Sequence, residues 1–517
     1  MAPILDSPSL RALVIIVPGL LLALYLAVQV GYGETPIAVY FLIGVAVLLV
    51  VKFSGEYVRF EGLVLGVLLF GYIVGQSGFG HFSFSPIGGI YLGEIGLVIC
   101  SAAVLMRLVF TRARIVPKQP IAWGILALML IGTLRFIYDF RNSVNGMDVI
   151  RDFATIYYAA FFFIAFNVCQ HSGSRLFLQR TVTVALVCAI FVSSVYFVVP
   201  SLFNYLMVHR RPFIEPRADL TGSFMGFGCI LFFLKGKQSR HYFSWTVLSF
   251  AAFVALLLPL SRATFLGFAV AVIVLMLSGQ TGFLLRLAAF GVVGIVTLTP
   301  IVLSVKSSGE ATYATMLQDK ILSVVEPFGG KRTFASEVGD ASAANNEFRT
   351  AWWKSVIGET NEKSPIVGMG FGYDLAKRFL RSYTAPLDPY EFFARSPHSI
   401  LLTVYGRMGL IGILSFGIVV FLIIRSSVCC AVAIRRGQTP AQDIALWCGI
   451  IAILVTGCFG VMLEGPMAGI VFWSLLGMAS HREWERTQPA QSGIQGVARS
   501  SVPILETASS QIASRIA

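Results

Sequence analysis

Charged side chains are scarce in this sequence. Asp, Glu, Lys and Arg make up 13% of the residues, whereas hydrophobic residues make up 56% and the mean hydropathy is +0.79. A soluble globular protein typically carries about 25% charged residues. The shortage of charge therefore excludes an ordinary soluble protein and indicates a polytopic membrane protein.

Cysteine is absent from the long polar segment between residues 306 and 395. The eight cysteines lie in apolar runs or in a loop predicted to be cytoplasmic: Cys100, Cys169, Cys188, Cys229, Cys429, Cys430, Cys448 and Cys458. This placement indicates neither a disulfide framework nor a cysteine-based zinc site.

The net charge of +13 does not indicate nucleic-acid binding, because the basic residues lie between apolar runs and do not gather on one soluble face. With the N-terminus in the cytoplasm, the short loops on that side hold most of the loop Lys and Arg residues. This bias is the one that retains loops in the cytoplasm. The long loop Lys306 to Arg395 is then external.

The apolar runs predict an all-α polytopic membrane protein with about 12–14 transmembrane helices. The first run, Ala12 to Val30, is read as a retained helix because further runs follow directly. Four regions result: an N-terminal transmembrane bundle (1–304), a periplasmic loop domain with short helices (305–397), C-terminal transmembrane helices (398–480) and a cytoplasmic tail (481–517). The tail has a composition typical of disorder.

Arginines on the external side form the first candidate site. Arg210, Arg211 and Arg217 lie in HRRPFIEPRADL, and Arg262 lies in PLSRATF between two adjacent runs. A guanidinium offers a planar fork of donors that matches phosphate oxygens, so these side chains are candidates to hold a lipid pyrophosphate. The alternative is that they reach lipid headgroups or pair with nearby carboxylates.

His398 forms the second candidate site. In SPHS, Ser396 is a plausible N-cap and Pro397 a plausible first helical residue, which would place His398 in the first turn of the next helix. The helix dipole would keep the imidazole neutral and able to accept a proton. The alternative is a histidine that only caps the helix. Arg407 is predicted to point away from His398 on that helix.

The glycines of PIVGMGFG permit a tight turn and close backbone approach. No Lys-Ser/Thr pair follows them, so a nucleotide-binding P-loop is not supported.

These motifs together resemble the O-antigen ligase and O-antigen polymerase superfamily. The resemblance rests on SRAT (Ser261 to Thr264), FRTAWW (Phe348 to Trp353), PIVGMGFG (Pro365 to Gly372) and HSILLTVYGRMGLIG (His398 to Gly412). It implies a GT-C-like membrane glycosyltransferase of the bacterial inner membrane. Such an enzyme transfers an undecaprenyl-pyrophosphate-linked glycan to an acceptor glycan or glycolipid at its periplasmic face, with inversion and without nucleotide, metal or other cofactor.

The resemblance also assigns residues. It implies that His398 activates the acceptor hydroxyl, that Arg211 and Arg262 hold the pyrophosphate, and that Arg349 is the arginine before the aromatic pair. Two departures bear on the assignment, since Ser399 stands where the family usually has Asn and Arg407 where it often has an acidic residue.

The implied partners are the lipid-linked glycan, the acceptor and membrane lipids, with a chain-length regulator as a further candidate and no nucleic acid. Ligase and polymerase stay open, because they share donor and chemistry. A flippase for lipid-linked oligosaccharide is the alternative from another class, since intramembrane charges such as Arg135 and Arg286 suit a translocation path.

Overall fold

The computed structural model describes residues 58–81, 91–111, 116–143, 145–198, 207–208, 211–212, 214–304, 337–382 and 395–487. Two predicted spans, at 12–30 and 37–51, lie outside these residues, as do Arg210 and the tail after 487. The described chain is almost wholly helical, apart from the two-residue strands β1 (Met207–Val208) and β2 (Arg211–Pro212), which pair antiparallel. The predicted all-α membrane class is therefore confirmed.

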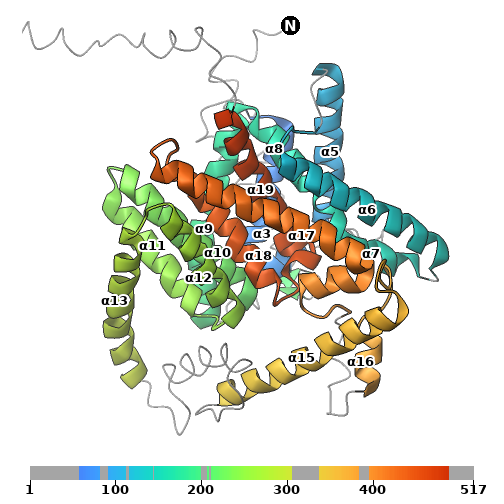
Figure 1. Cartoon of the computed structure of the whole chain (residues 1–517). Coiled ribbons are helices and arrows are strands. Elements are labelled where there is room, and N and C mark those ends of the chain that lie inside the picture. The colour runs from blue at the N-terminus through green and yellow to red at the C-terminus, as the bar shows by residue number, and fades with distance from the viewer. Residues whose placement is uncertain are drawn as a thin grey trace, which may run out of the picture.

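The helices follow one another along the chain in the order shown in Figure 1. They are α3 (Phe60–Val74), α4 (Gln76–Gly80), α5 (Leu92–Thr111), α6 (Pro120–Asn142), α7 (Gly146–Tyr157), α8 (Ala160–Cys169), α9 (Ser172–Val198), α10 (Ala218–Gln238), α11 (Tyr242–Leu257), α12 (Arg262–Leu277), α13 (Gly282–Ser304), α15 (Glu337–Lys363), α16 (Lys377–Ser382), α17 (Ile400–Arg435), α18 (Asp443–Gly457), the 3₁₀ helix η3 (Met462–Glu464) and α19 (Pro466–Thr487).

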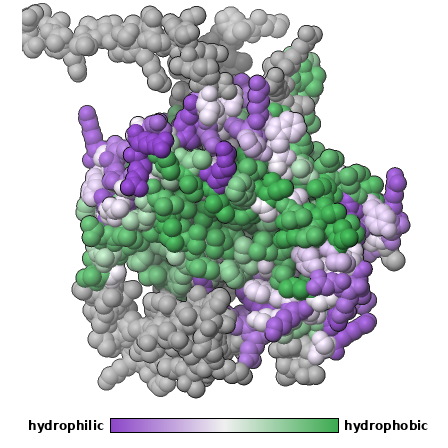
Figure 2. Space-filling view, viewed as in Figure 1, coloured by the Kyte–Doolittle hydropathy of each residue, from purple (hydrophilic) through white to green (hydrophobic). Residues whose placement is uncertain are grey.

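Several helices are long and apolar enough to cross a bilayer. Among the described residues five meet this criterion, and the bent pair α7 and α8 makes a sixth if it counts as one span. Further apolar helices are shorter, among them α3, α11, α12 and α18. Figure 2 shows the result as a hydrophobic band with hydrophilic side chains above and below it. Helices α15 and α16 lie on the lower side of this band in the same view (Figure 1).

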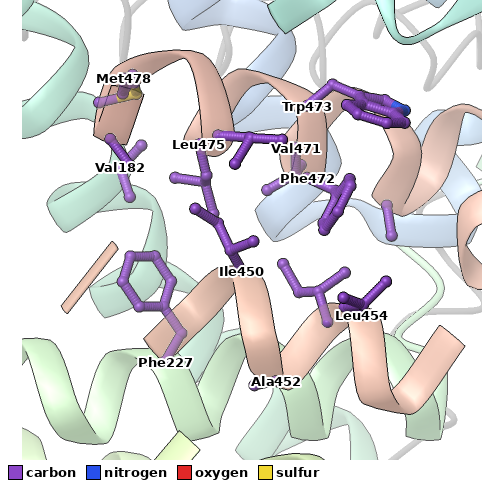
Figure 3. Close-up of a cluster of buried hydrophobic side chains, with 14 of the residues drawn as sticks. Val182, Phe227, Ile450, Ala452, Leu454, Val471, Phe472, Trp473, Leu475 and Met478 are labelled. Atoms are coloured by element: carbon purple, nitrogen blue, oxygen red, sulfur yellow. The ribbon is translucent and has the colours of Figure 1, made fainter. Parts of the chain in front are cut away.

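The core lies where α18 and α19 pack among α8, α10 and α12. Figure 3 shows Phe227 of α10 beside Ile450 of α18, with Leu475 of α19 above them. Glycines let the backbones approach closely, as is common for helices packed in membranes. A Cβ on Gly267 of α12 would lie 2.6 Å from the carbonyl oxygen of Ala452 in α18. This packing fixes the ends of α10, α12 and α18 relative to one another.

Helix α17 is broken inside its span. Gly409 has φ 61° and ψ −152°, a combination that only glycine adopts readily. The turn at residues 365–372 fills the break, and we call the turn and residues 406–411 together the α17 clamp. Its backbone hydrogen bonds are Met369 N to Gly406 O (2.7 Å), Gly370 N to Arg407 O (3.1 Å), Leu410 N to Pro365 O (2.9 Å) and Ile411 N to Ile366 O (3.1 Å). The turn thus satisfies backbone groups that would otherwise be unpaired within a membrane helix.

Two predicted boundaries differ from the structure. Helix α17 begins at Ile400 with Ser399 as its N-cap, so the predicted N-cap Ser396 and first helical residue Pro397 are wrong. Helix α19 continues to Thr487, past the boundary predicted at residue 480. The helix extends because His481 and Trp484 both pack on Phe166 of α8, with ring centroids 5.4 and 5.9 Å away.

Candidate functional site

His398 lies just before α17 and not in its first turn, where the sequence predicted it. Its φ of 54° is in the left-handed region, which interrupts the helical conformation at this residue. The first helical hydrogen bond runs from Thr403 N to Ser399 O (2.9 Å). His398 is therefore presented by the segment that leads into the helix.

The imidazole of His398 is half-buried beside Trp352 of α15, and the two ring centroids are 5.6 Å apart. Burial lowers the pKa of His398 to about 4, and the positive charges of Arg349 and Arg217 act in the same direction. The negative charge of Asp219 partly opposes them. The histidine is thus neutral near pH 7, as predicted, but burial and arginines are the main causes and the helix dipole is not needed.

Helix α15 holds the site together through one of its faces. Trp353 donates through Nε1 to the carbonyl of Pro397 (2.6 Å), the residue before His398. One turn earlier, Arg349 donates through Nη1 to the carbonyl of Phe459 (2.6 Å), just beyond α18. Trp352 is fully buried in a small apolar cluster between α15 and α16. Trp352 thus packs among apolar side chains and donates to the carbonyl of Leu375 (3.0 Å), whereas Trp353 bonds the segment before His398.

Arg349 is a half-buried cation near His398. Burial lowers the pKa of Arg349, while the charge of Asp219 opposes that shift. Among the described residues no carboxylate lies within salt-bridge distance of Arg349, and its bond to Phe459 is to a neutral carbonyl. Its positive charge is therefore available to a negatively charged ligand.

Arg262 and Asp219 join the same region from α12 and α10. Arg262 is the first residue of α12 and donates through Nη1 to Oδ1 of Asn346 on α15 (2.7 Å). Ser261, its N-cap, donates to Oδ1 of Asp219 in the first turn of α10 (2.8 Å). Because Asn346 and Arg349 are one helical turn apart on α15, the structure brings Arg262 and Arg349 to the same stretch in the middle of this helix.

The other predicted arginines are placed less completely. Arg217 is the N-cap residue of α10, is exposed, and donates its backbone N–H to Oε1 of Gln76 (2.9 Å). Arg211 belongs to β2, where its backbone position pairs with Val208, and its side chain lies outside the described part. Arg210 lies outside it altogether. The pyrophosphate role of Arg211 stays a prediction.

A carboxylate that sequence reasoning did not select also lies near this end of α17. Glu464 of η3 accepts a hydrogen bond from Oγ1 of Thr403 (2.8 Å), less than two turns after His398. A signal was present, because a carboxylate at the edge of an apolar span is costly unless it is used or paired. Trp353 was visible only as part of FRTAWW, since nothing local predicts its bond to Pro397.

A second polar cluster surrounds the α17 clamp. Arg407 is 3% exposed and forms an ion pair with Asp152 of α7. Asp152 also accepts the N–H of Gly372 (2.8 Å), and Arg395 donates to the carbonyl of Gly372 (2.6 Å). Arg407 therefore has its own partner and is not part of the His398 cluster, which agrees with the predicted direction of its side chain.

Residues 247–417 match the family model described as O-antigen ligase. Over these residues the chain is similar to the O-antigen ligase family. The matched segment holds Arg262, Arg349 and His398, which the structure gathers around the middle of α15. The O-antigen ligase segment leaves out Asp219, Arg217, Glu464 and Asp152, so the rest of both clusters comes from flanking parts of the chain. No curated protein matches this chain.

The chemistry available here follows from the geometry. A neutral imidazole can accept a proton, while neighbouring guanidinium groups stabilise negative charge. His398 lies just before the apolar helix α17, and Arg262 begins the apolar helix α12.

Proposed function

We propose that this protein is an inner-membrane glycosyltransferase of surface polysaccharide synthesis. It transfers a glycan from undecaprenyl pyrophosphate to an acceptor sugar, as a ligase or a polymerase of O-antigen or exopolysaccharide. The observation that carries the proposal is the neutral, half-buried His398 near the half-buried cation Arg349, both within the O-antigen ligase segment.

Each group has a defined task in the transfer. The bond between the anomeric carbon and the phosphate oxygen breaks, and its electrons remain on the departing pyrophosphate. Arg349 and Arg262 stabilise that charge, with Arg211, Arg210 and Arg217 as further phosphate contacts. The acceptor hydroxyl attacks from the opposite face and gives its proton to His398, so the anomeric configuration inverts.

Donor binding also strengthens the base. Without ligand, the charges of Arg349 and Arg217 help to lower the pKa of His398. A bound pyrophosphate places negative charge beside these arginines, which favours protonated imidazole. His398 therefore becomes a better proton acceptor when the donor is in place.

The site faces the periplasm in this proposal, because the loop that contains α15 and α16 lies on the side opposite the Lys- and Arg-rich loops. That side is also where a translocated lipid-linked glycan and its acceptor meet.

The test is glycan transfer by the purified protein in detergent, with an undecaprenyl-pyrophosphate-linked repeat unit, an acceptor and EDTA. We expect transfer of the glycan to the acceptor with release of undecaprenyl pyrophosphate. A flippase would show no transfer, because detergent removes the compartments between which it moves lipid. A sample with wild-type fold that transfers nothing under these conditions contradicts the proposal.

A deletion strain separates the two enzyme subclasses. Loss of a polymerase leaves single repeat units on the surface, whereas loss of a ligase leaves long glycan on its lipid carrier.

A further inference from the structure

Asp152 stands at the junction of three parts of the chain. It projects from α7, far before the O-antigen ligase segment, and its side chain is 10% exposed. Its Oδ2 accepts the N–H of Gly372 in the α17 clamp (2.8 Å) and pairs with Arg407 of α17. Nη2 of Arg395 lies 3.6 Å from the same oxygen.

Arg395 connects this junction to the segment that contains His398. It is three residues before His398, forms an ion pair with Asp148 of α7, and donates to the carbonyl of Gly372 (2.6 Å). The backbone from Arg395 to Ser399 includes the left-handed His398 and the Pro397 carbonyl that Trp353 binds. Trp353 thus fixes this short segment next to His398, while Arg395 and its two α7 carboxylates fix the start of the segment.

Arg407 of α17 also depends on the carboxylate of Asp152. Its guanidinium is buried, its Nε has no partner among the described residues, and Asp152 is its ion-pair partner there. A buried charge without its partner is strongly unfavourable, so the ion pair between Arg407 and Asp152 holds α17 against α7.

We infer that Asp152 is a positioning residue, which locks the segment carrying His398 and the broken helix α17 to α7. This inference rests on the proposed function for its consequence, because the geometry being held is that of the proposed base. It adds the N-terminal half of the chain to the machinery, since α7 lies outside the O-antigen ligase segment.

Asp139 provides a matched control. It lies on α6, is similarly buried, and accepts the N–H of Phe371 (2.7 Å), the residue before Gly372. Its ion-pair partner is Arg135 on its own helix (2.9 Å), and no described bond links it to Arg395. Asp139 therefore holds the turn without holding the segment that leads to His398.

The kinetic test compares Asp152→Asn with Asp139→Asn in the purified protein. We expect Asp152→Asn to lower kcat by about 100-fold with a much smaller change in the donor KM, because small displacements of a reacting group cost about this much. We expect Asp139→Asn to retain most of kcat. Asp152→Glu, which keeps the charge, should recover part of the loss.

The pH profile of kcat is a second measurement, and a general loss of stability would not shift its acid limb. The charges facing His398 are Arg349 from α15 and Arg217 and Asp219 from the start of α10, and none of them changes in Asp152→Asn. If the segment loosens, water reaches the imidazole and its pKa rises toward the ordinary value. The acid limb of kcat should then move to higher pH in Asp152→Asn and stay in place in Asp139→Asn.

Hydrogen exchange tests the inference without any activity. We expect amides at 369–372 to exchange faster in both variants, and amides at 396–400 to exchange faster only in Asp152→Asn. If the wild type transfers no glycan, the proposed function fails, and this exchange comparison still decides whether Asp152 positions the segment.

The double variant Asp152→Asn with Arg407→Met guards against simple unfolding, because it removes both buried charges. We expect it to regain wild-type thermal stability while kcat stays low and the acid limb stays shifted. Recovery of both would mean that Asp152 only neutralises Arg407, and would overturn the inference. So would identical behaviour of Asp152→Asn and Asp139→Asn in kinetics and exchange.

Discussion

Two polar clusters border α17, one at its start and one at its break, and hold their charges in opposite ways. In the α17 clamp, buried charges face opposite charges: Arg407 pairs with Asp152, and Arg135 with Asp139 at 2.9 Å. Around His398, Arg349 donates to the neutral carbonyl of Phe459. The first cluster pairs its charges directly, whereas in the second Arg349 has no described ion pair and the charge of Asp219 acts on it from a distance.

The paired charges of the first cluster serve to hold the structure, whereas the charges around His398 are suited to act on a ligand. A buried charge already paired has little left to offer a ligand and contributes mainly to geometry. A desolvated cation with a neutral partner attracts an anion strongly, because water screens it poorly. Variants of the two clusters should therefore fail in different ways, the His398 cluster in turnover and the clamp in stability and geometry.

The largest effect is expected from His398→Ala. Removal of the proposed base should lower kcat by about 10²–10⁴-fold. Quantified transfer by purified protein measures it, and an unchanged melting temperature in detergent confirms that the fold persists. Near-normal transfer by a well-folded variant would show that His398 is not the base. The two clusters would then no longer differ in their effect on turnover.

Arg349→Lys is expected to rank next, with Arg262→Lys alongside it. Lysine keeps the charge but loses the planar fork that fits phosphate, so kcat should fall by about 10²–10³-fold. Arg378→Lys is the control, because Arg378 pairs with Glu362 on the exposed surface of the α15–α16 element. Equal activity of all three variants would favour the view that these arginines only meet lipid headgroups.

Gly409→Ala should destabilise the α17 clamp. An added Cβ would lie 2.5 Å from Gly368 N and from the carbonyl group of Ile366, in a backbone conformation that alanine rarely adopts. We expect a loss of about 1–3 kcal/mol in the free energy of unfolding. Gly417→Ala, on the same helix with no atom within 4 Å of its added Cβ, should leave stability unchanged or slightly higher. Equal melting temperatures of the two variants would show that the break in α17 is not required.

The smallest effect concerns pH. In the free enzyme His398 must be neutral to accept a proton, so kcat/KM should be lost as the pH falls through its folded pKa of about 4, and not near the ordinary 6.5. Arg217→Gln removes one of the charges that lower this pKa. The acid limb of kcat/KM should rise by less than about one pH unit, because an exposed charge is screened. A limb that moves downward would contradict the stated electrostatics.

The sequence was sufficient for features that depend on local pattern. Apolar runs predicted the helical membrane class, and the family motifs selected Arg262, Arg349 and His398, which the structure gathers around α15. A neutral His398 was predicted from a place in the first turn of a helix, whereas the structure puts it before the helix and burial is the main cause.

What the sequence did not predict depends on contacts between distant residues. The Arg407–Asp152 pair spans 255 positions, and nothing near either residue specifies the other. The clamp is similar: the glycines of the turn and Gly409 are each compatible with many turns, and only their mutual hydrogen bonds select this one. The start of α17 was misplaced because Trp353 holds the carbonyl of Pro397 outside the helix.

The α17 clamp has a consequence for engineering. The turn that closes the break belongs to the O-antigen ligase segment, but the carboxylates that hold the turn come from α6 and α7. The segment is thus not a portable module. A chimera that exchanges residues 247–417 to change acceptor preference should also exchange α6 and α7. If it keeps the original α6 and α7, the new turn faces Asp139 and Asp152, which bind the backbone N–H groups of the original turn.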